Sequence, residues 1–265
     1  MPEGPETLRY TNYLRRAMEG NILTNVNIVS GRYTKKPIQG LEYIQFPERV
    51  YSVDCKGKFI YAVLNSGTCM FSTLGMSGGW YYKPTKHNRV VLEFAEGQAY
   101  FNDVRNFGTL KFVPNVDELN KKLSSLGPDM LSSHVSDNLF QERLQKKNKK
   151  TIVEALMDQS VISGVGNYIK SDSLWLAKIS PFRIVETLSQ KEIRNLKNSI
   201  INVMQTSYNM KGATILSYKN PDGSDGDYGS RFVVYNSKRD PLNNDVIKVL
   251  TPDGRSTYWV PEVQR

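Results

Sequence analysis

Two kinds of hydrophobic pattern alternate along the chain. Between Ile22 and Asn102, β-branched and aromatic residues form short runs that turn signals such as Asn65-Ser66-Gly67 separate. Such runs predict antiparallel strands joined by hairpins. The expected strands cover residues 22–30, 49–55, 59–64, 68–74, 89–94 and 99–102. Many short strands of this kind indicate a β-sandwich of antiparallel sheets.

Helical spacing precedes and follows this β region. Leu8, Leu14 and Met18 predict a helix over residues 5–19, with Pro5 in its first turn. After residue 129 the pattern becomes helical, and helices are expected at 136–145, 150–158, 167–177 and 189–208. Residues 220–230 are rich in Gly and Asp and predict a mobile loop. Strands are expected at 231–235, 246–250 and 256–260. The chain is therefore predicted to be α+β, with parts at 1–125, 126–215 and 216–265.

Composition narrows the class of partner. The chain has 265 residues, a net charge of +9 and a pI near 9.4. This balance favours a polyanion such as nucleic acid, although surplus lysine also serves as solubilising surface. No apolar run is long enough to span a membrane, and no signal-peptide pattern is present. Cys55 and Cys69 are expected to be buried, reduced thiols of an intracellular protein, and a zinc site is not expected from the Cys and His spacing.

The first six residues contain a candidate nucleophile. Once Met1 is removed, Pro2 carries a secondary amine that can attack an electrophilic carbon and form a cationic iminium. Such an amine is partly unprotonated at neutral pH, because α-amino groups titrate at about pH 8. Glu3 stands beside it and can transfer a proton. The alternative is a disordered tail ahead of the first helix.

A glycine-rich turn lies between two predicted helices. Gly164, Gly166 and Asn167 allow a sharp turn, and Asn167 is predicted to cap the next helix. A helix N-terminus after such a turn presents free N–H groups to a phosphate. The alternative is an ordinary helical hairpin.

Several motifs together resemble one family. Met157-Asp158-Gln159 followed by Gly164-Val165-Gly166-Asn167-Tyr168 resembles the helix–two-turn–helix of the formamidopyrimidine-DNA glycosylase/endonuclease VIII family. Pro2-Glu3-Gly4-Pro5-Glu6 is similar to the endonuclease VIII branch. Further motifs occur in the family's order and spacing: Leu74-Gly75-Met76-Ser77-Gly78, Arg105-Asn106-Phe107-Gly108 and Leu126-Gly127-Pro128-Asp129. The resemblance extends from residue 2 to about residue 260.

The resemblance implies catalytic roles. Pro2 would attack C1′ of the damaged nucleotide, and Glu3 would protonate the sugar ring oxygen and later shuttle protons. Glu6 resembles a second active-site carboxylate. Lys58 matches the lysine of a β-hairpin that contacts the phosphate beside the lesion. Lys56, two residues away, is the alternative lysine, and a solvated hairpin is the alternative for both.

Three other residues resemble those that fill the void left by an extruded base. They are Met76, Arg105 and Phe107. Flipping a base out of the duplex loses stacking and pairing, which inserted side chains partly replace. For Met76 and Phe107 the alternative is ordinary core packing.

The tail departs from the four-cysteine zinc finger of bacterial members. Residues 241–244 and 259–262 contain no cysteine, yet Thr251-Pro252-Asp253-Gly254 is a strong hairpin turn. This resembles the zincless finger of some eukaryotic and viral members and implies no metal and no cofactor. Arg255 would grip a phosphate, together with Lys58, Gly166 and Asn167. Packing of Val249, Tyr258 and Trp259 is expected to hold the hairpin, and an exposed arginine on a turn is the alternative.

The resemblance implies a bifunctional DNA glycosylase/AP lyase acting by β,δ-elimination. Oxidised pyrimidines and hydantoins are the expected substrates. The alternative is a formamidopyrimidine/8-oxoguanine enzyme, because Gly212-Ala213-Thr214-Ile215-Leu216 resembles that branch's base-capping region. A non-catalytic DNA-binding protein is the other alternative. The expected partner is damaged DNA, duplex or single-stranded, bound by a monomer wherever DNA is located, with no membrane association.

Overall fold

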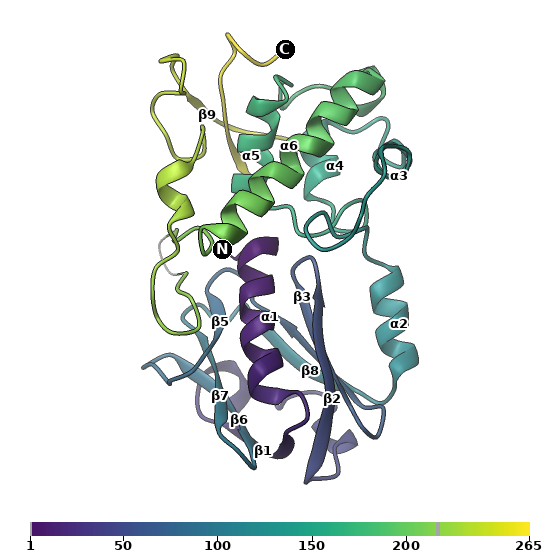
Figure 1. Ribbon diagram of the computed structural model, residues 1–265, viewed down its shortest axis with the longest axis vertical. Helices are drawn as coiled ribbons and strands as arrows, with labels where there is room; N and C mark the ends of the chain where they lie inside the picture. The colour runs from purple at the N-terminus through teal and green to yellow at the C-terminus, as the bar shows by residue number, and fades with distance from the viewer. Residues whose placement is uncertain (1, 216–217) are drawn as a thin grey trace. The chain divides into compact units, whose positions relative to one another are not determined.

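The computed structural model describes residues 2–215 and 218–265 of the chain, which pack into two compact units (Figure 1). The first unit contains the chain up to Ser125 together with Lys211–Asp227. The second contains Leu126–Met210 and Tyr228–Arg265. Residues 211–215 and 218–227 thus pack with the first unit, whereas the sequence-based division sets a boundary after residue 215. None of the described helices is long and apolar enough to cross a membrane.

The first unit is an antiparallel sandwich, as predicted. Its eight strands hydrogen-bond in the order β5-β7-β6-β1-β2-β3-β4-β8. The strands of the two four-stranded halves are joined where β1 pairs with β2, at Ile22 and Leu23. Trp80 Nε1 in one half donates to Ser72 Oγ in the other over 3.1 Å, so the halves face each other. The strands are β1 (Ile22–Ile28), β2 (Glu48–Lys56), β3 (Phe59–Leu64), β4 (Cys69–Thr73), β5 (Gly78–Tyr81), β6 (Asn88–Phe94), β7 (Gln98–Asp103) and β8 (Thr109–Val113).

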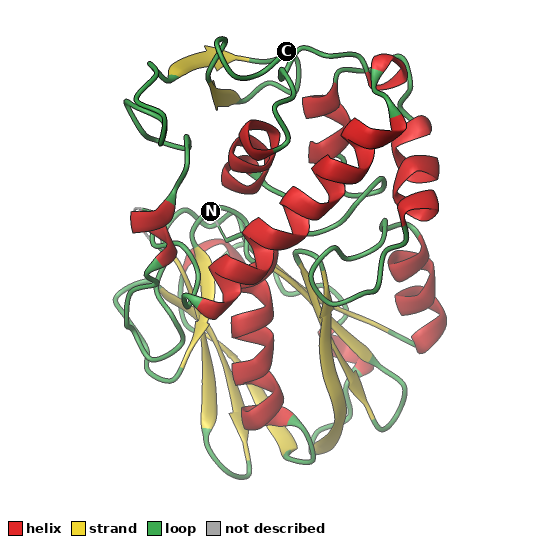
Figure 2. Cartoon of the chain, turned by 45° about the horizontal axis from the view of Figure 1, so that its top comes forward, coloured by secondary structure: helices red, strands yellow, loops and turns green. Residues whose placement is uncertain are grey.

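Helix α1 (Gly4–Met18) lies against both halves of the sandwich (Figure 2). Tyr10, Leu14 and Met18 recur every four residues and are buried in the common core. The Tyr10 hydroxyl donates to that of Tyr81 in β5 over 2.9 Å, and Arg15 Nε donates to the Val53 carbonyl in β2 over 3.1 Å. These contacts fix the direction of both strands relative to the helix.

Strands β5 and β8 and helix α2 (Val116–Ser124) are absent from the sequence-based prediction. The first two residues of β5 are glycines, which indicate a turn when only the local sequence is considered. Packing explains Gly79, because a Cβ atom there would approach the Tyr10 hydroxyl to 2.4 Å. The unit also contains the short 3₁₀ helices η1 (Gly31–Thr34) and η2 (Leu41–Tyr43).

The second unit is mainly helical, and its four longer helices match the predicted ones to within two residues. Ser189 and Glu192 form a capping box that begins the longest of them, α6. The helices are α3 (Asp137–Gln145), α4 (Ile152–Met157), α5 (Asn167–Leu176), η3 (Val185–Thr187), α6 (Gln190–Asn209) and η4 (Tyr228–Arg231), and a hairpin of β9 (Ile247–Leu250) and β10 (Ser256–Trp259) follows.

The prediction of a strand at residues 231–235 is wrong. Here η4 ends at Arg231, and the following N–H groups of Val233, Val234 and Tyr235 donate to the buried carboxylate of Asp172 in α5 over 2.9–3.1 Å. A β-branched run favours a strand, but a buried carboxylate takes up the N–H groups that a partner strand would need. Loop residues 220–227 precede η4.

Asp172 provides a pH-dependent test of this packing. Burial raises its pKa from 3.8 to about 6, against the lowering effect of the three N–H groups. Because the folded pKa exceeds the unfolded one, the carboxyl's stabilising contribution is complete below about pH 4 and is lost as pH rises through 6. The unfolding free energy of wild type relative to Asp172→Asn should therefore fall by roughly 3 kcal/mol from pH 4 to 7, as urea titrations can measure.

Asp137→Asn is the matched control for this experiment. Lys197 and Arg194 lower the pKa of the exposed Asp137 carboxyl, so its contribution should instead be lost on acidification. A pH-independent difference between wild type and Asp172→Asn would contradict the assignment of Asp172.

Candidate functional site

The N-terminal residues are buried and ordered by the start of α1. Pro2 is buried, and Glu3 is 2% exposed. Glu3 and Glu6 form a capping box: the Glu3 side chain accepts from the backbone N–H of Glu6, and Glu6 Oε2 accepts from the backbone N–H of Glu3 over 2.7 Å. The disordered tail considered above is thus wrong for residues 2–6: Glu3 is the N-cap of α1, and Pro2 directly precedes it.

Glu6 also binds the segment that follows α6. Its Oε1 accepts from the backbone N–H of Ala213 over 2.8 Å, while Gly212 adopts φ +83°. A Cβ on Gly212 would approach both Glu6 Oε1 and the Tyr218 hydroxyl to 3.0 Å. Burial and the Glu6 carboxylate raise the pKa of Tyr218, which remains a hydroxyl donor to Asn220. One carboxylate therefore joins the N-terminus to the expected base-capping segment, of which Leu216 lies outside the described residues.

Lys58 lies in the two-residue turn between β2 and β3. Lys56 pairs with Phe59, and Gly57 supplies the positive φ that the turn needs. Strand β2 runs antiparallel to α1, since the Gly20 N–H donates to the Val50 carbonyl at one end of the helix and Arg15 reaches Val53 further along. Continued to its end, β2 brings the turn to the N-terminal end of α1 (Figure 1).

The structure separates the two candidate lysines. Lys56 Nζ donates to the Leu123 carbonyl at the end of α2 over 2.8 Å, which directs it toward that helix. Lys58 is half-buried and follows Gly57 at the tip of the hairpin. Because Lys56 is directed toward α2, Lys58 is the better candidate of the two.

The loops that carry Met76, Arg105 and Phe107 are joined by Asp103, which the sequence analysis did not single out. Asp103 Oδ1 accepts from the Ser77 hydroxyl over 2.6 Å, and its Oδ2 accepts from the Gly108 N–H over 2.7 Å. The Arg105 N–H donates to the same Ser77 hydroxyl over 2.9 Å. In the sequence Asp103 stands between Asn102 and Val104, and no local signal connects it to Ser77 or Gly108.

Core packing does not describe the two apolar members of this group. Met76 is 39% exposed and Phe107 is 53% exposed. The Arg105 guanidinium lies 5.0 Å from the centre of the Phe107 ring, a cation–π contact. Exposed apolar side chains beside an arginine can contact a stacked ligand.

In the second unit the predicted cap is wrong: Gly166 is the N-cap of α5, and Asn167 is the first helical residue. The cap does not need the Asn167 side chain, whose Nδ2 instead donates to the Ser256 carbonyl over 2.8 Å. Its Oδ1 is buried without a hydrogen-bond partner among residues 2–215 and 218–265. Asn167 therefore joins the helix N-terminus to the hairpin.

The turn before α5 is braced from both sides. Gln159 Nε2 donates to the Val165 carbonyl over 3.0 Å, and its Oε1 accepts from the Gly164 N–H over 3.1 Å. Gly127 donates its N–H to the Gln159 carbonyl, and a Cβ there would approach the Val161 carbonyl to 2.3 Å. The Leu126–Asp129 motif thus supports the turn, and its glycine is required by this close approach.

Arg255 is exposed just after the turn between β9 and β10. Tyr258 packs on Tyr235 with ring centres 5.1 Å apart, and Trp259 packs on Phe182 at 5.5 Å. Within the part of the chain that the structure describes, no three His, Cys, Asp or Glu residues gather as a metal site would require.

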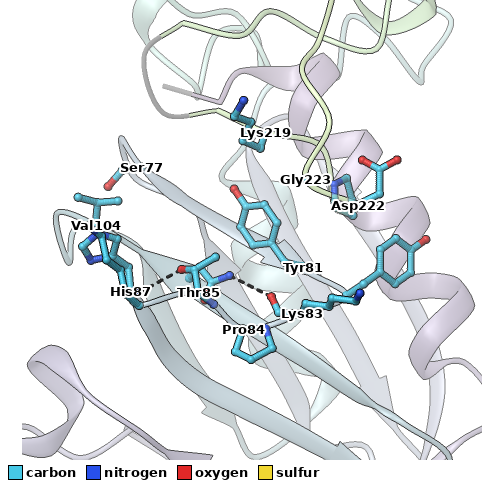
Figure 3. Close-up of a pocket in the computed structure, with 14 residues that line it drawn as sticks. Ser77, Tyr81, Lys83, Pro84, Thr85, His87, Val104, Lys219, Asp222 and Gly223 are labelled. Atoms are coloured by element: carbon cyan, nitrogen blue, oxygen red, sulfur yellow. Dashed lines mark hydrogen bonds between the residues drawn. The ribbon is translucent and has the colours of Figure 1, made fainter.

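The first unit also contains a cavity of about 680 Å³ between β5, the 82–87 loop and residues 219–223 (Figure 3). Its polar groups hydrogen-bond to one another: the Thr85 N–H donates to Asn102 Oδ1, and the His87 N–H donates to the Thr85 hydroxyl. Tyr81 accepts from Tyr10. These contacts stabilise the cavity wall.

The two units together define a protein with an N-terminal β-sandwich and a helix–two-turn–helix. The formamidopyrimidine-DNA glycosylase N-terminal domain matches residues 1–110, the H2TH domain matches 126–219, and the C-terminal domain matches 224–265. The formamidopyrimidine-DNA glycosylase of Wolbachia pipientis wMel is 32% identical, over 98% of both chains. That of Exiguobacterium sp. is 29% identical over the whole of both.

Solved structures agree with these matches. MutM (Fpg) of Thermus thermophilus superposes with a TM-score of 0.87 at 29% identity, covering 99% of this chain and 98% of that one. A Lactococcus lactis Fpg variant bound to Fapy-dG-containing DNA gives 0.87 at 25% identity over all of both chains. The chain belongs to the formamidopyrimidine-DNA glycosylase family and is a DNA glycosylase of base excision repair. These matches do not specify the endonuclease VIII branch.

Proposed function

We propose that the protein is a bifunctional DNA glycosylase and AP lyase that uses the amine of Pro2 as its nucleophile. The observation that carries the proposal is the buried Pro2-Glu3 pair at the start of α1. Glu6 holds this pair in place, because its carboxylate accepts hydrogen bonds from the backbone N–H groups of both Glu3 and Ala213. A proline amine next to a carboxylate is a nucleophile with a proton donor beside it.

The chemistry proceeds in two stages. The Pro2 nitrogen bonds to C1′ as the bond between C1′ and the damaged base breaks, and the base departs with the electron pair and the proton that the amine loses. Glu3 then protonates the sugar ring oxygen O4′, the C1′–O4′ bond opens, and the nitrogen lone pair completes a cationic iminium at C1′. The iminium acidifies the C–H at C2′, so that loss of this proton expels the 3′ phosphate. Loss of a second proton, from C4′, then expels the 5′ phosphate in a second elimination. The half-buried Lys58 contacts the phosphate beside the lesion in this proposal. Borohydride should trap the iminium on a duplex with one abasic site, and absence of an adduct would contradict the proposal.

The lesion class has two candidates. The Pro-Glu-Gly-Pro-Glu start favours oxidised pyrimidines and hydantoins, as expected for the endonuclease VIII branch. The names of the related enzymes favour formamidopyrimidine purines, as does the DNA in the Lactococcus lactis complex. Duplexes carrying one thymine glycol, hydantoin, formamidopyrimidine or 8-oxoguanine, compared at equal concentrations, separate the two by their single-turnover excision rates.

A phosphate-binding site in the second unit completes the proposal. The N-terminus of α5, Asn167 and Arg255 supply N–H groups, an amide and a guanidinium, the groups that bind phosphate in proteins. Met76, Arg105 and Phe107 are the proposed void-filling residues. The protein would act as a monomer on damaged DNA, with a hairpin that holds its fold without zinc or any cofactor.

Arg255→Ala should weaken binding to damaged DNA by roughly ten- to hundredfold, the value of a hydrogen bond to a charged group. Neighbours cannot rebuild a bidentate guanidinium contact. The slope of log affinity against log salt should also decrease by about 0.9, as loss of one phosphate contact requires. Fluorescence anisotropy over a salt series measures both.

Arg239→Ala is the control for Arg255→Ala. The Arg239 side chain is 55% exposed and pairs with Asp245 in the same unit. Its replacement by alanine removes one positive charge, as Arg255→Ala does. Wild-type affinity and slope for Arg255→Ala would exclude Arg255 from the phosphate site.

A further inference from the structure

A buried ion pair joins the hairpin to α5. Lys170 Nζ lies 2.5 Å from Asp253 Oδ2, and the two side chains are 0% and 2% exposed. Lysine and aspartate are almost never fully buried unless they are paired. Removing two charges from water offsets much of their attraction, so such a pair adds little net stability. It does fix geometry, because either charge alone in the interior is strongly unfavourable.

Asp253 uses its other oxygen to shape the turn that carries Arg255. Its Oδ1 lies 2.5 Å from the Thr251 hydroxyl and accepts from the Arg255 N–H over 3.4 Å. The Thr251 N–H donates to the Arg255 carbonyl over 3.0 Å and closes the turn. The carboxylate that holds Lys170 is therefore part of the turn.

Two more contacts join the same face of α5 to β10. Asn167 Nδ2 donates to the Ser256 carbonyl over 2.8 Å, and the Tyr258 N–H donates to the Ser171 hydroxyl over 3.5 Å. Asn167, Lys170 and Ser171 are spaced three and four residues apart, which places them on one face of a helix. Since Asn167 binds the residue directly after Arg255, this docking places Arg255 beside the N-terminus of α5.

We propose that the Lys170–Asp253 ion pair positions Arg255 for phosphate binding by fixing the tip of the hairpin on α5. The inference rests on the proposed function, because it assigns a task to the phosphate site. Lys170 and Asp253 are positioning residues: both are buried, and they act on DNA through Arg255. In a hairpin without cysteine, the ion pair supplies the rigid connection between the turn and the helix.

The test is the double variant Lys170→Met/Asp253→Asn. Asparagine keeps an acceptor for Thr251 and the Arg255 N–H, methionine fills the space of the lysine stem, and no buried charge is left alone. Net charge is unchanged, so long-range attraction to DNA is preserved. The probe is a duplex with one tetrahydrofuran abasic analogue, titrated over a salt series, and thermal unfolding verifies the fold of each variant.

The double variant should bind the duplex roughly ten- to hundredfold more weakly, with a salt slope lower by about 0.9, the same changes that are expected for Arg255→Ala. In an Arg255→Ala background the same double substitution should have no further effect, because residues that act through one group are not additive. Lys149→Met/Glu186→Gln, which neutralises an exposed pair in the same unit, is the control and should bind as wild type does.

Wild-type affinity and slope in the folded double variant would overturn the inference, and so would losses that add to that of Arg255→Ala. If the double variant unfolds, Asp253→Glu tests the same point, because it keeps the charge but moves the carboxylate by one methylene. The inference is supported if Asp253→Glu weakens binding in the wild-type background but has no further effect in the Arg255→Ala background. Unchanged binding of Asp253→Glu overturns it. Borohydride trapping of the wild-type protein on a duplex with one abasic site tests the proposed function separately. Its result does not depend on how the Lys170 and Asp253 variants bind DNA.

Discussion

Protein that retains Met1 should form no borohydride-stable adduct with a duplex carrying an abasic site, whereas protein that begins at Pro2 should form one. Retention of Met1 converts the Pro2 nitrogen into an amide, which is not a nucleophile. The new amine lies one residue away, while Glu3 remains fixed by its hydrogen bonds with Glu6. The displaced amine therefore cannot take the place of the Pro2 nitrogen.

The measurement combines intact mass, trapping and peptide mapping. Intact mass establishes which N-terminus each preparation has, and the trapped peptide should be the N-terminal one. Pro2→Gly keeps an amine at the same place, but a primary one, and should trap more slowly. An adduct that maps to Lys56 or Lys58, or full activity with Met1 in place, would exclude Pro2 as the nucleophile.

Glu3→Gln should lower the single-turnover rate of base excision by roughly 10²–10⁴-fold while leaving DNA binding intact. The glutamine side chain keeps an oxygen that accepts the Glu6 N–H, so the start of α1 should still be capped. What it loses is the transferable proton. The expected result is therefore a change in the chemical step alone.

Excision under single-turnover conditions and binding to a tetrahydrofuran duplex are measured on the same preparation. Glu96→Gln, which alters an exposed carboxylate of the same unit, should match wild type in both. A Glu3→Gln protein that excises at the wild-type rate would show that another group supplies the proton. One that loses binding and excision equally would assign Glu3 a structural role.

Glu6 explains why the proposed catalytic N-terminus depends on residues more than two hundred positions away. Its two oxygens hold the Glu3 N–H and the Ala213 N–H, and both bonds are buried. Buried N–H groups that lose an acceptor cost stability, so movement of either segment disturbs the other. Glu6 therefore couples the position of the start of α1 to that of the segment around Ala213.

The sequence by itself determined the elements whose signals are local. The helix that begins near Pro5, the strand at 59–64 and the helix predicted at 189–208 follow from helical spacing and β-propensity. It also indicated Pro2, Glu3, Lys58, Asn167 and Arg255 as a set, because motifs in one order resemble one family. Their roles remain predictions.

Tertiary structure decided what depends on partners distant in the chain. The run at 231–235 has the composition of a strand, but Asp172, sixty-one residues before Val233, takes its N–H groups. The glycines of β5 indicate a turn until Tyr10 is packed against Gly79. A lysine in a helix is usually solvated, yet the Lys170 side chain is 0% exposed and forms an ion pair with Asp253. Local propensity amounts to tenths of a kcal/mol per residue, whereas leaving a buried charge or N–H unpaired costs several times more, so the distant partner prevails.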